Sequence, residues 1–105
     1  METQTLFFNR LKDGVTPEAY EAWVRERDYP TARALSSIRS YEIMRLDEPA
    51  RPGGIDVPAD YLEVVTVSTY DEYDSELASM PGRDEFVAEL RSFVDCVLVV
   101  RSHTI

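Results

Sequence analysis

Three side chains in this sequence have the chemistry to transfer protons. His103 is the only histidine, and its imidazole titrates near neutral pH, which suits a general acid or base. Glu63 stands within an apolar run, where burying a carboxylate without a partner is costly. Asp28 ends a predicted helix, directly before Tyr29 and Pro30. We therefore predict that His103, Asp28 and Glu63 are candidate catalytic residues.

Each candidate also has a structural interpretation. His103 lies near the end of the last predicted strand, where strands fray. Glu63 could form a structural ion pair with Arg101, which belongs to another strand of the same predicted sheet. Asp28 could cap the end of its helix or pair with Arg27. The sequence supports both interpretations of each residue.

Charge and composition exclude several classes of function. The 105 residues include 11 Lys and Arg against 20 Asp and Glu, which gives a net charge of −9. Nucleic acids and anionic membranes attract basic surfaces, so we expect neither as a partner. The single cysteine, Cys96, cannot form an intramolecular disulfide, and no spacing of Cys and His fits a zinc site. We find no signal peptide and no apolar run long enough to span a membrane, and we expect a cytoplasmic protein.

The sequence also lacks the common cofactor signatures. It has no glycine-rich phosphate loop and no serine elbow, and His103 would be the sole imidazole available to a haem. Flavin and nicotinamide sites have no signature either. We predict no cofactor and no metal. An enzyme of this kind would transfer protons in a dry, aromatic pocket and catalyse a cyclisation, dehydration or isomerisation.

The periodicity of apolar residues predicts alternating strands and helices. Strands are expected over residues 3–11, 38–46, 61–68 and 96–104, and helices from Pro17 to near Asp28, over a short piece at 31–35, from the Thr69 capping box to the break at Met80-Pro81-Gly82, and over 83–94. Residues 47–59 are expected to form a loop. This β-α-β-β-α-β order is that of one ferredoxin-like α+β domain spanning residues 1–105. Its sheet should be antiparallel, with the last strand beside the first, the first beside the third, the third beside the second, and both longer helices on one face.

Alternation along the strands divides their side chains between two faces of the sheet. The aliphatic face carries Leu6, Phe8, Leu62, Val64, Thr66, Leu98 and Val100. The mixed face carries Thr5, Phe7, Asn9, Tyr61, Glu63, Val65, Val67, Val97, Val99, Arg101 and His103. Helices can cover only one face, and soluble monomers rarely expose a large apolar patch. We predict a homodimer in which a second copy covers the aliphatic face, and a small-molecule pocket between the mixed face and the helices.

The inner side of the first helix supplies further candidates for this pocket. Tyr20, Trp23, Val24 and Arg27 share one helical face by their spacing, which directs Trp23 at the sheet. We also expect Glu63 and Arg101 to form one electrostatic unit near Asn9. The candidate substrate-binding residues are Phe7, Asn9, Trp23, Arg27, Tyr29, Tyr41, Tyr61 and Arg101.

The segment from Trp23 to Tyr41 carries a family resemblance. It reads WVRERDYP at residues 23–30, TAR at 31–33 and LSSIRSY at 35–41. With the order of elements, this segment resembles the RedY/HapK-like proteins of prodiginine pigment biosynthesis, within the dimeric α+β barrel superfamily. The resemblance implies a small homodimer that acts in secondary metabolism on a pyrrole-containing or polyketide-like intermediate.

A looser likeness is to plant polyketide cyclases of the same fold, through the Leu11-Lys12-Asp13 turn followed by Thr16. It implies a pocket between sheet and helices, but the catalytic histidine of those enzymes falls near Arg83 here, so their mechanism does not carry over. Three hypotheses follow. The protein is a cofactor-free biosynthetic enzyme, a cofactor-independent monooxygenase, or a carrier that holds a reactive intermediate.

Overall fold

The computed structural model describes residues 2–105. Its strands are β1 (Thr3–Leu11), β2 (Ile38–Arg45), β3 (Tyr61–Val67) and β4 (Val94–His103). Its helical elements are α1 (Pro17–Trp23), the π-helical turn η1 (Val24–Asp28), α2 (Tyr29–Arg33), α3 (Tyr70–Ser79) and α4 (Arg83–Phe93). This order confirms the predicted α+β class.

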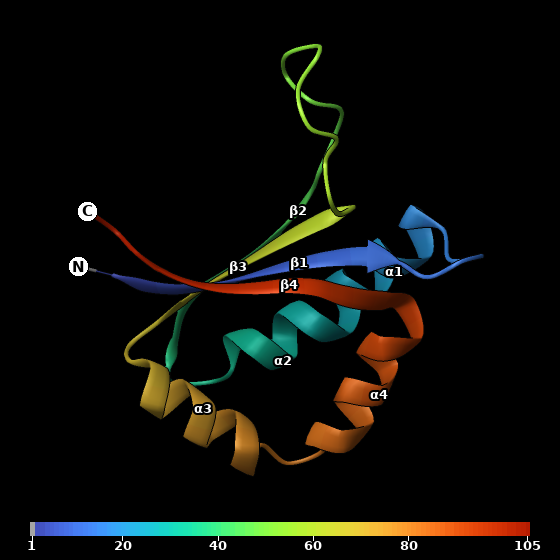
Figure 1. Cartoon of the computed structure of the whole chain (residues 1–105). Coiled ribbons are helices and arrows are strands. Elements are labelled where there is room, and N and C mark those ends of the chain that lie inside the picture. Colours follow the sequence, from blue (N-terminus) through green and yellow to red (C-terminus); the bar gives the residue numbers. More distant parts are fainter. Residues whose placement is uncertain (1) are drawn as a thin grey trace.

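The four strands form one antiparallel sheet in the order β2-β3-β1-β4, as the sequence predicts. All the helices lie on the same side of this sheet, and the opposite face carries none (Figure 1). The uncovered face is the aliphatic face, where Leu98 is 50% and Val100 38% exposed. The helices therefore cover only the mixed face, and they leave it open at β4, where Val99 is 53% exposed.

Local signals in the sequence explain where the helices begin. The Thr16 side chain accepts a hydrogen bond from the Ala19 N–H at 3.2 Å, and Pro17 occupies the first turn of α1. Thr69 likewise accepts from the Glu72 N–H at 3.1 Å at the start of α3. Gly82 separates α3 from α4 with a φ of +73°, a left-handed conformation that favours glycine.

The first helical region does not break near Asp28, contrary to the sequence-based expectation. Instead, α1 continues through η1 into α2, and the Tyr29 N–H donates to the Val24 carbonyl, one residue further back than in an α-helix. Pro30 has no N–H to donate to the carbonyl four residues before it, which favours the wider turn. The extra residue in the turn changes the helical phase between Trp23 and Asp28.

A second irregularity lies in the sheet. Phe8 faces Leu98 across β1 and β4, but its neighbour Asn9 faces Cys96, so β4 contains a bulge at Val97. The bulge shifts the alternation of β4 by one residue. The assignment of Val97 to the mixed face is therefore wrong at this position, where Cys96 lies opposite Asn9.

The core divides into two clusters of buried residues on the mixed face. One contains Ala32, Tyr41, Val65, Val67 and Tyr73, and the other contains Tyr20, Val24, Tyr61 and Val94. Helix α4 contributes no fully buried residue to either. This helix therefore stands away from the sheet, with space beneath it.

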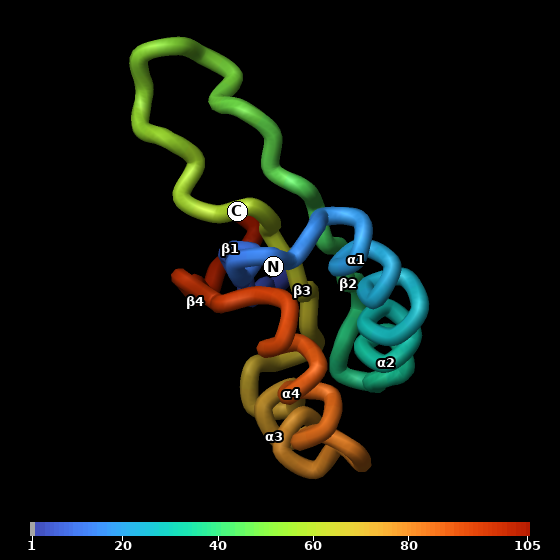
Figure 2. Tube along the Cα trace, turned by 90° about the vertical axis from the view of Figure 1, so that its right-hand side faces the viewer, coloured from blue at the N-terminus to red at the C-terminus, as the bar shows by residue number. Residues whose placement is uncertain are grey.

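The connection between β2 and β3 leaves the body of the molecule as a long arm. It projects beyond the sheet on the side away from the helices, which both views show (Figures 1 and 2). A backbone hydrogen bond of 2.9 Å from the Leu46 N–H to the Asp60 carbonyl closes its base. Ile55, within the arm, is 94% exposed.

Candidate functional site

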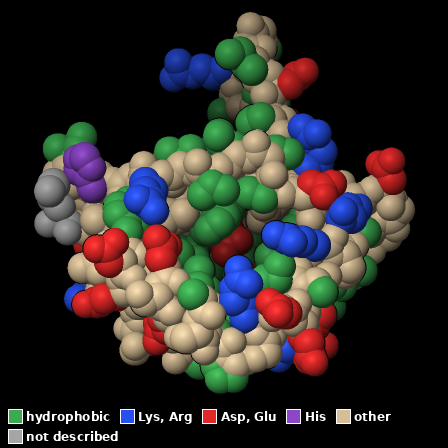
Figure 3. All heavy atoms as spheres, turned by 60° about the horizontal axis from the view of Figure 1, so that its bottom comes forward, with side chains coloured by type: hydrophobic (Ala, Val, Ile, Leu, Met, Phe, Trp, Pro, Cys, Tyr) green, Lys and Arg blue, Asp and Glu red, His purple; other side chains and the backbone are tan. Residues whose placement is uncertain are grey.

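A cavity of about 520 Å³ lies between the mixed face and the helices. Its wall is mainly apolar, and the larger apolar side chains in it include Phe7, Leu35, Tyr73, Leu77, Phe86 and Leu90. Seen from the helix side, the hollow has an acidic side chain at its floor and hydrophobic side chains around it (Figure 3). A mostly apolar cavity with a few polar groups is the usual form of a small-molecule site.

Asp28 is the first of two carboxyl groups in the cavity wall. The π-helical turn places it there with 1% exposure. The Tyr41 hydroxyl donates a 2.8 Å hydrogen bond to its Oδ1, whereas its Oδ2 is buried without a partner. Burial raises the pKa of Asp28 to about 6, although the hydrogen bond from Tyr41 opposes the shift.

Glu63 is the second carboxyl group. It occupies the middle of β3, between Phe7 of β1 and Ile43 of β2, and is 7% exposed. The Asn9 amide donates to its Oε2 at 3.4 Å. Burial raises the pKa of Glu63 to about 8, and the negative charge of Asp28 adds to the shift.

These two carboxyl groups titrate on opposite sides of neutrality. At pH 7 the Asp28 side chain is mainly ionised and can accept a proton, while Glu63 is mainly protonated and can donate one. Two carboxyl groups whose surroundings separate their pKa values can serve as a base and an acid in one site. The cavity thus has both functions in its wall without any histidine.

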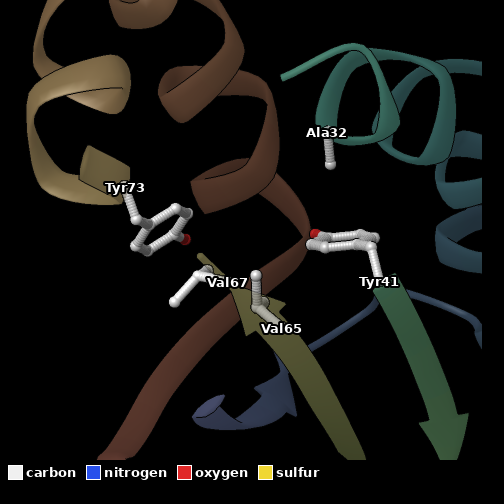
Figure 4. Packing of buried hydrophobic residues seen from close by; sticks show 5 residues of the cluster. All are labelled: Ala32, Tyr41, Val65, Val67 and Tyr73. Atoms are coloured by element: carbon white, nitrogen blue, oxygen red, sulfur yellow. The ribbon is translucent and has the colours of Figure 1, made fainter. Parts of the chain in front are cut away.

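Two tyrosines complete the polar part of the wall. The rings of Tyr41 from β2 and Tyr73 from α3 point their hydroxyl groups toward one another above Val65 (Figure 4). Burial raises the pKa of both hydroxyls, so that both stay protonated in the physiological range. They are therefore hydrogen-bond donors and not bases.

The cavity brings together five of the eleven candidate residues from the sequence: Phe7, Asn9, Asp28, Tyr41 and Glu63. The other six lie outside its wall: Trp23, Arg27, Tyr29, Tyr61, Arg101 and His103. The reasons differ from residue to residue.

The expected pairing of Arg101 with Glu63 is wrong. Arg101 lies opposite Thr5, two residues further along β4 than the position facing Phe7, and its guanidinium stacks over the Tyr70 ring at 4.5 Å. Its ionic partner is Asp74 of α3, at 3.5 Å. Strand alternation placed Arg101 on the correct face of the sheet, but it could not show how far along the strands Arg101 lies from Glu63.

His103 also lies far along the sheet from the carboxyl pair. It is exposed at the end of β4, paired with Thr3, and outside the cavity wall. Its proposed role beside Asp28 has no geometric support. The sequence argument relied on the residue type of His103 and could not give its distance from the cavity. The last strand extends beyond the cavity, and the imidazole lies at its end.

Trp23 and Arg27 hold α4 in place. The indole N–H donates to Glu89 Oε1 at 3.0 Å, and the Arg27 guanidinium binds both oxygens of Glu89 at 3.2 and 3.3 Å. The indole also packs on Phe86 and Phe93 with ring centroids 5.5 and 5.4 Å away. Trp23 therefore packs between α4 and the core cluster that contains Tyr61 and Val94, outside the cavity wall.

Tyr29 and Tyr61 have structural partners as well. The Tyr29 hydroxyl accepts from the Ile43 N–H at 3.1 Å and donates to the Ile43 carbonyl at 3.3 Å, which satisfies part of the β2 edge. The Tyr61 hydroxyl donates to Glu21 at 2.6 Å. Both hydroxyls are occupied and neither side chain lines the cavity.

Sequence reasoning missed Tyr73, Cys96 and three cations in the wall, Lys12, Arg83 and Arg91. Arg83 and Arg91 flank the predicted apolar stripe of α4 at helical spacing, and this signal could have found them. Cys96 is exposed. Burial of its thiol nevertheless raises its pKa, which disfavours the nucleophilic thiolate.

Within residues 2–105, no group of three or more His, Cys, Asp or Glu side chains could hold a metal ion. Over the same residues, no helix is long and apolar enough to cross a membrane.

The sequence of residues 3–105 matches the family described as REDY-like protein HapK. The chain belongs to this family. No curated protein gives a significant sequence match. Among solved structures, HapK from Hahella chejuensis is similar with a TM-score of 0.80 and 19% identity, over 98% of this chain and 92% of that one.

Two further solved structures share the fold. SnoaB from Streptomyces nogalater, a cofactor-independent oxygenase, has a TM-score of 0.74 and 13% identity over 99% of this chain and 93% of its own. A dimeric ferredoxin-like protein from Thermobifida fusca has a TM-score of 0.61 and 18% identity over 97% of this chain and 88% of its own. At these identities the likeness establishes the ferredoxin-like fold alone.

Proposed function

We propose that this protein is a cofactor-free enzyme of secondary metabolism that transfers protons on a small aromatic, pyrrole-containing or polyketide-like intermediate. The reaction class is cyclisation, dehydration or isomerisation. The observation that carries the proposal is the pair Asp28 and Glu63, a base and an acid in the wall of one apolar cavity. Membership of the HapK family supports the biosynthetic setting.

The two carboxyl groups divide the proton transfers between them. Asp28 Oδ2 has no partner, and it removes a proton from the carbon beside a carbonyl group. The electron pair of the broken C–H bond moves to the carbonyl oxygen, which takes the proton of Glu63. In a dehydration, Glu63 gives its proton to the departing hydroxyl group instead.

The proton must then return from Asp28 to Glu63. The Tyr41 hydroxyl donates to Asp28 and lines the same cavity as Glu63, so it is the group that would carry this proton as a relay. In an isomerisation no return is needed, because Asp28 gives its proton to a different carbon and Glu63 recovers its own.

A model ketone tests this chemistry directly. We expect the protein to accelerate solvent deuterium incorporation beside the carbonyl of 2-tetralone, followed by NMR, and Asp28→Asn to reduce the acceleration by about 100-fold. Asp47→Asn, which removes an exposed carboxylate of the arm, is the matched control. An unchanged rate in Asp28→Asn would refute the role of Asp28 as base.

The likeness to SnoaB favours one alternative, a cofactor-independent monooxygenase, in which the ionised substrate reacts with oxygen directly. Asp28 would still remove the proton. An oxygen electrode distinguishes the two reactions, because only the monooxygenase consumes oxygen during turnover. Binding of the same molecules without deuterium incorporation or oxygen uptake would instead support a carrier.

We further propose that the protein is a homodimer through its aliphatic face. No helix covers this face, and Met44, Leu98 and Val100 on it are 43%, 50% and 38% exposed. Burial of such a patch against a second copy removes apolar surface from water. The fold shared with the dimeric protein of Thermobifida fusca agrees with this assembly.

A further inference from the structure

The side of helix α4 that lines the cavity combines apolar side chains with arginines. Phe86, Val87 and Leu90 form an apolar stripe at helical spacing, and Arg83 and Arg91 extend the same stripe at its two ends. None of the five is fully buried, and all line the cavity. An apolar helix face bounded by two arginines can cover an apolar molecule and contact a negative charge beside it.

The cations of the cavity wall are only partly neutralised. Lys12 pairs with Asp95 at 2.9 Å, and both residues line the cavity. Arg83 has a 3.4 Å contact with its neighbour Asp84, whose side chain is 98% exposed. Arg91 has no ion pair among residues 2–105. We call Lys12, Arg83 and Arg91 the cationic rim.

This rim contrasts with the rest of the molecule. The chain carries a net charge of −9, yet Lys and Arg side chains gather around the hollow on the helix side (Figure 3). Arg83 and Arg91 are exposed, so they stand at the open part of the cavity, whereas Asp28 is 1% exposed at its closed part. The cavity therefore has a positive mouth and a negative floor.

One carboxylate oxygen at the floor also lacks a hydrogen-bond donor. Asp28 Oδ2 is buried in the cavity wall without a partner, and a buried carboxylate oxygen left unpaired is costly. A ligand N–H or O–H group would satisfy one of its two lone pairs, and the other stays available for the proton that the proposed reaction removes from carbon. The negative charge at the floor would repel an anionic group from that end and so fix the orientation of the ligand.

We infer that the ligand of this cavity is an amphiphilic anion with an apolar body, an N–H or O–H donor bound to Asp28 Oδ2, and a carboxylate-like group at the cationic rim. This inference names the substrate class of the proposed function and rests on it. The apolar wall between Asp28 and α4 contacts the apolar body of the ligand. Arg83 and Arg91 pair with its carboxylate-like group, which stays in contact with solvent.

A set of three fluorescent probes tests both ends of the assignment by anisotropy. We expect 6-hydroxy-2-naphthoate to bind tightest, its uncharged amide to bind at least about 5-fold more weakly, and 2-naphthoate, which lacks the hydroxyl donor, about 10-fold more weakly. Binding of the acid should weaken from about 0.01 M to about 1 M salt, and that of the amide should not.

Variants of the cationic rim test whether its arginines cause the preference for the acid. The double variant Arg83→Gln with Arg91→Gln should remove the preference for the acid over the amide. Arg51→Gln makes the same kind of charge change in the exposed arm and should leave the preference intact. Equal binding of acid and amide by the wild type, an unchanged preference in the double variant, or no binding of the acid at millimolar concentration would each overturn the inference.

The outcome is separable from that of the proposed function. Probe binding is measured without turnover, and the deuterium exchange of 2-tetralone is measured on an uncharged ketone. Selective binding of the acid without any exchange would refute the proton-transfer function and leave the ligand class standing. Deuterium exchange that depends on Asp28, without selective binding of the acid, would support the proton-transfer function and refute the ligand class.

Discussion

The Tyr41 hydroxyl fixes one oxygen of the Asp28 carboxylate and leaves the other open to the cavity. It donates to Oδ1 at 2.8 Å, and Oδ2 is buried without a partner. The hydrogen bond lowers the pKa of Asp28 against the larger effect of burial. The orientation of this carboxylate therefore depends on a single side chain of β2, which also limits the rise of its pKa.

The first prediction removes that hydrogen bond. In Tyr41→Phe the pKa of Asp28 should rise, because the bond that stabilises the ionised form is lost. The acidic limb of kcat/KM against pH should then move to higher pH, and stability should fall by about 1–3 kcal/mol. Tyr73→Phe is the control, since Tyr73 contacts the cavity without bonding Asp28. An acidic limb that stays in place in Tyr41→Phe would contradict this account.

The second prediction concerns the pH dependence of the wild type. The rate of deuterium exchange should follow a bell with limbs at about 6, where Asp28 ionises, and about 8, where Glu63 loses its proton. Glu63→Gln cannot donate a proton, and its rate should fall by about 100-fold. A rate that rises with pH and shows no basic limb would exclude Glu63 as the acid.

The third prediction links stability to the same groups. The folded protein holds the Glu63 proton up to about pH 8, whereas the unfolded chain releases it near pH 4.5. The folded state therefore binds more protons between these values, and the free energy of unfolding should fall as pH rises through this window and level off above it. Asp28 adds to the decline from about pH 3.8 to about 6.

Glu63→Gln isolates the contribution of Glu63 to this decline. The variant has no proton to lose, so its free energy of unfolding in urea should decline less between about pH 6 and about 8 than that of the wild type. At about pH 8 it should be the more stable protein. Parallel profiles for the two proteins would show that Glu63 is ionised in the folded state at neutral pH.

The fourth prediction tests the dimer. Sedimentation at micromolar concentration should give about twice the chain mass of 12.0 kDa. Leu98→Glu places a charge on the aliphatic face at a position that is already 50% exposed in one chain, so the chain should still fold but sediment as a monomer. Ala88→Glu, on the exposed side of α4, should leave the dimer intact. A wild-type monomer would remove the proposed interface.

Much of this protein follows from local patterns in its sequence. Alternating side chains located all four strands, and the short polar side chains of Thr16 and Thr69 marked the helix starts because their oxygens accept orphan backbone N–H groups. The same alternation placed Phe7, Asn9 and Glu63 on one face of the sheet. Residue type together with position, on that face for Glu63 and at a helix end for Asp28, was enough to find both carboxyl groups of the cavity.

The tertiary structure determined the side-chain contacts that local sequence patterns do not specify. The π-helical turn before Pro30 and the bulge at Val97 each shift a periodicity by one residue, which changed the phase of Asp28 relative to α1 and brought Cys96 opposite Asn9. Trp23 precedes the turn, and its contacts with Phe86 and Phe93 of α4 depend on how the helices pack. The choice of ionic partners was equally non-local. Arg101 binds Asp74 and Arg27 binds Glu89 because side-chain pairing depends on distance in space. The sequence thus determined the fold and its two buried carboxyl groups, whereas packing alone determined which side chains share the cavity with them.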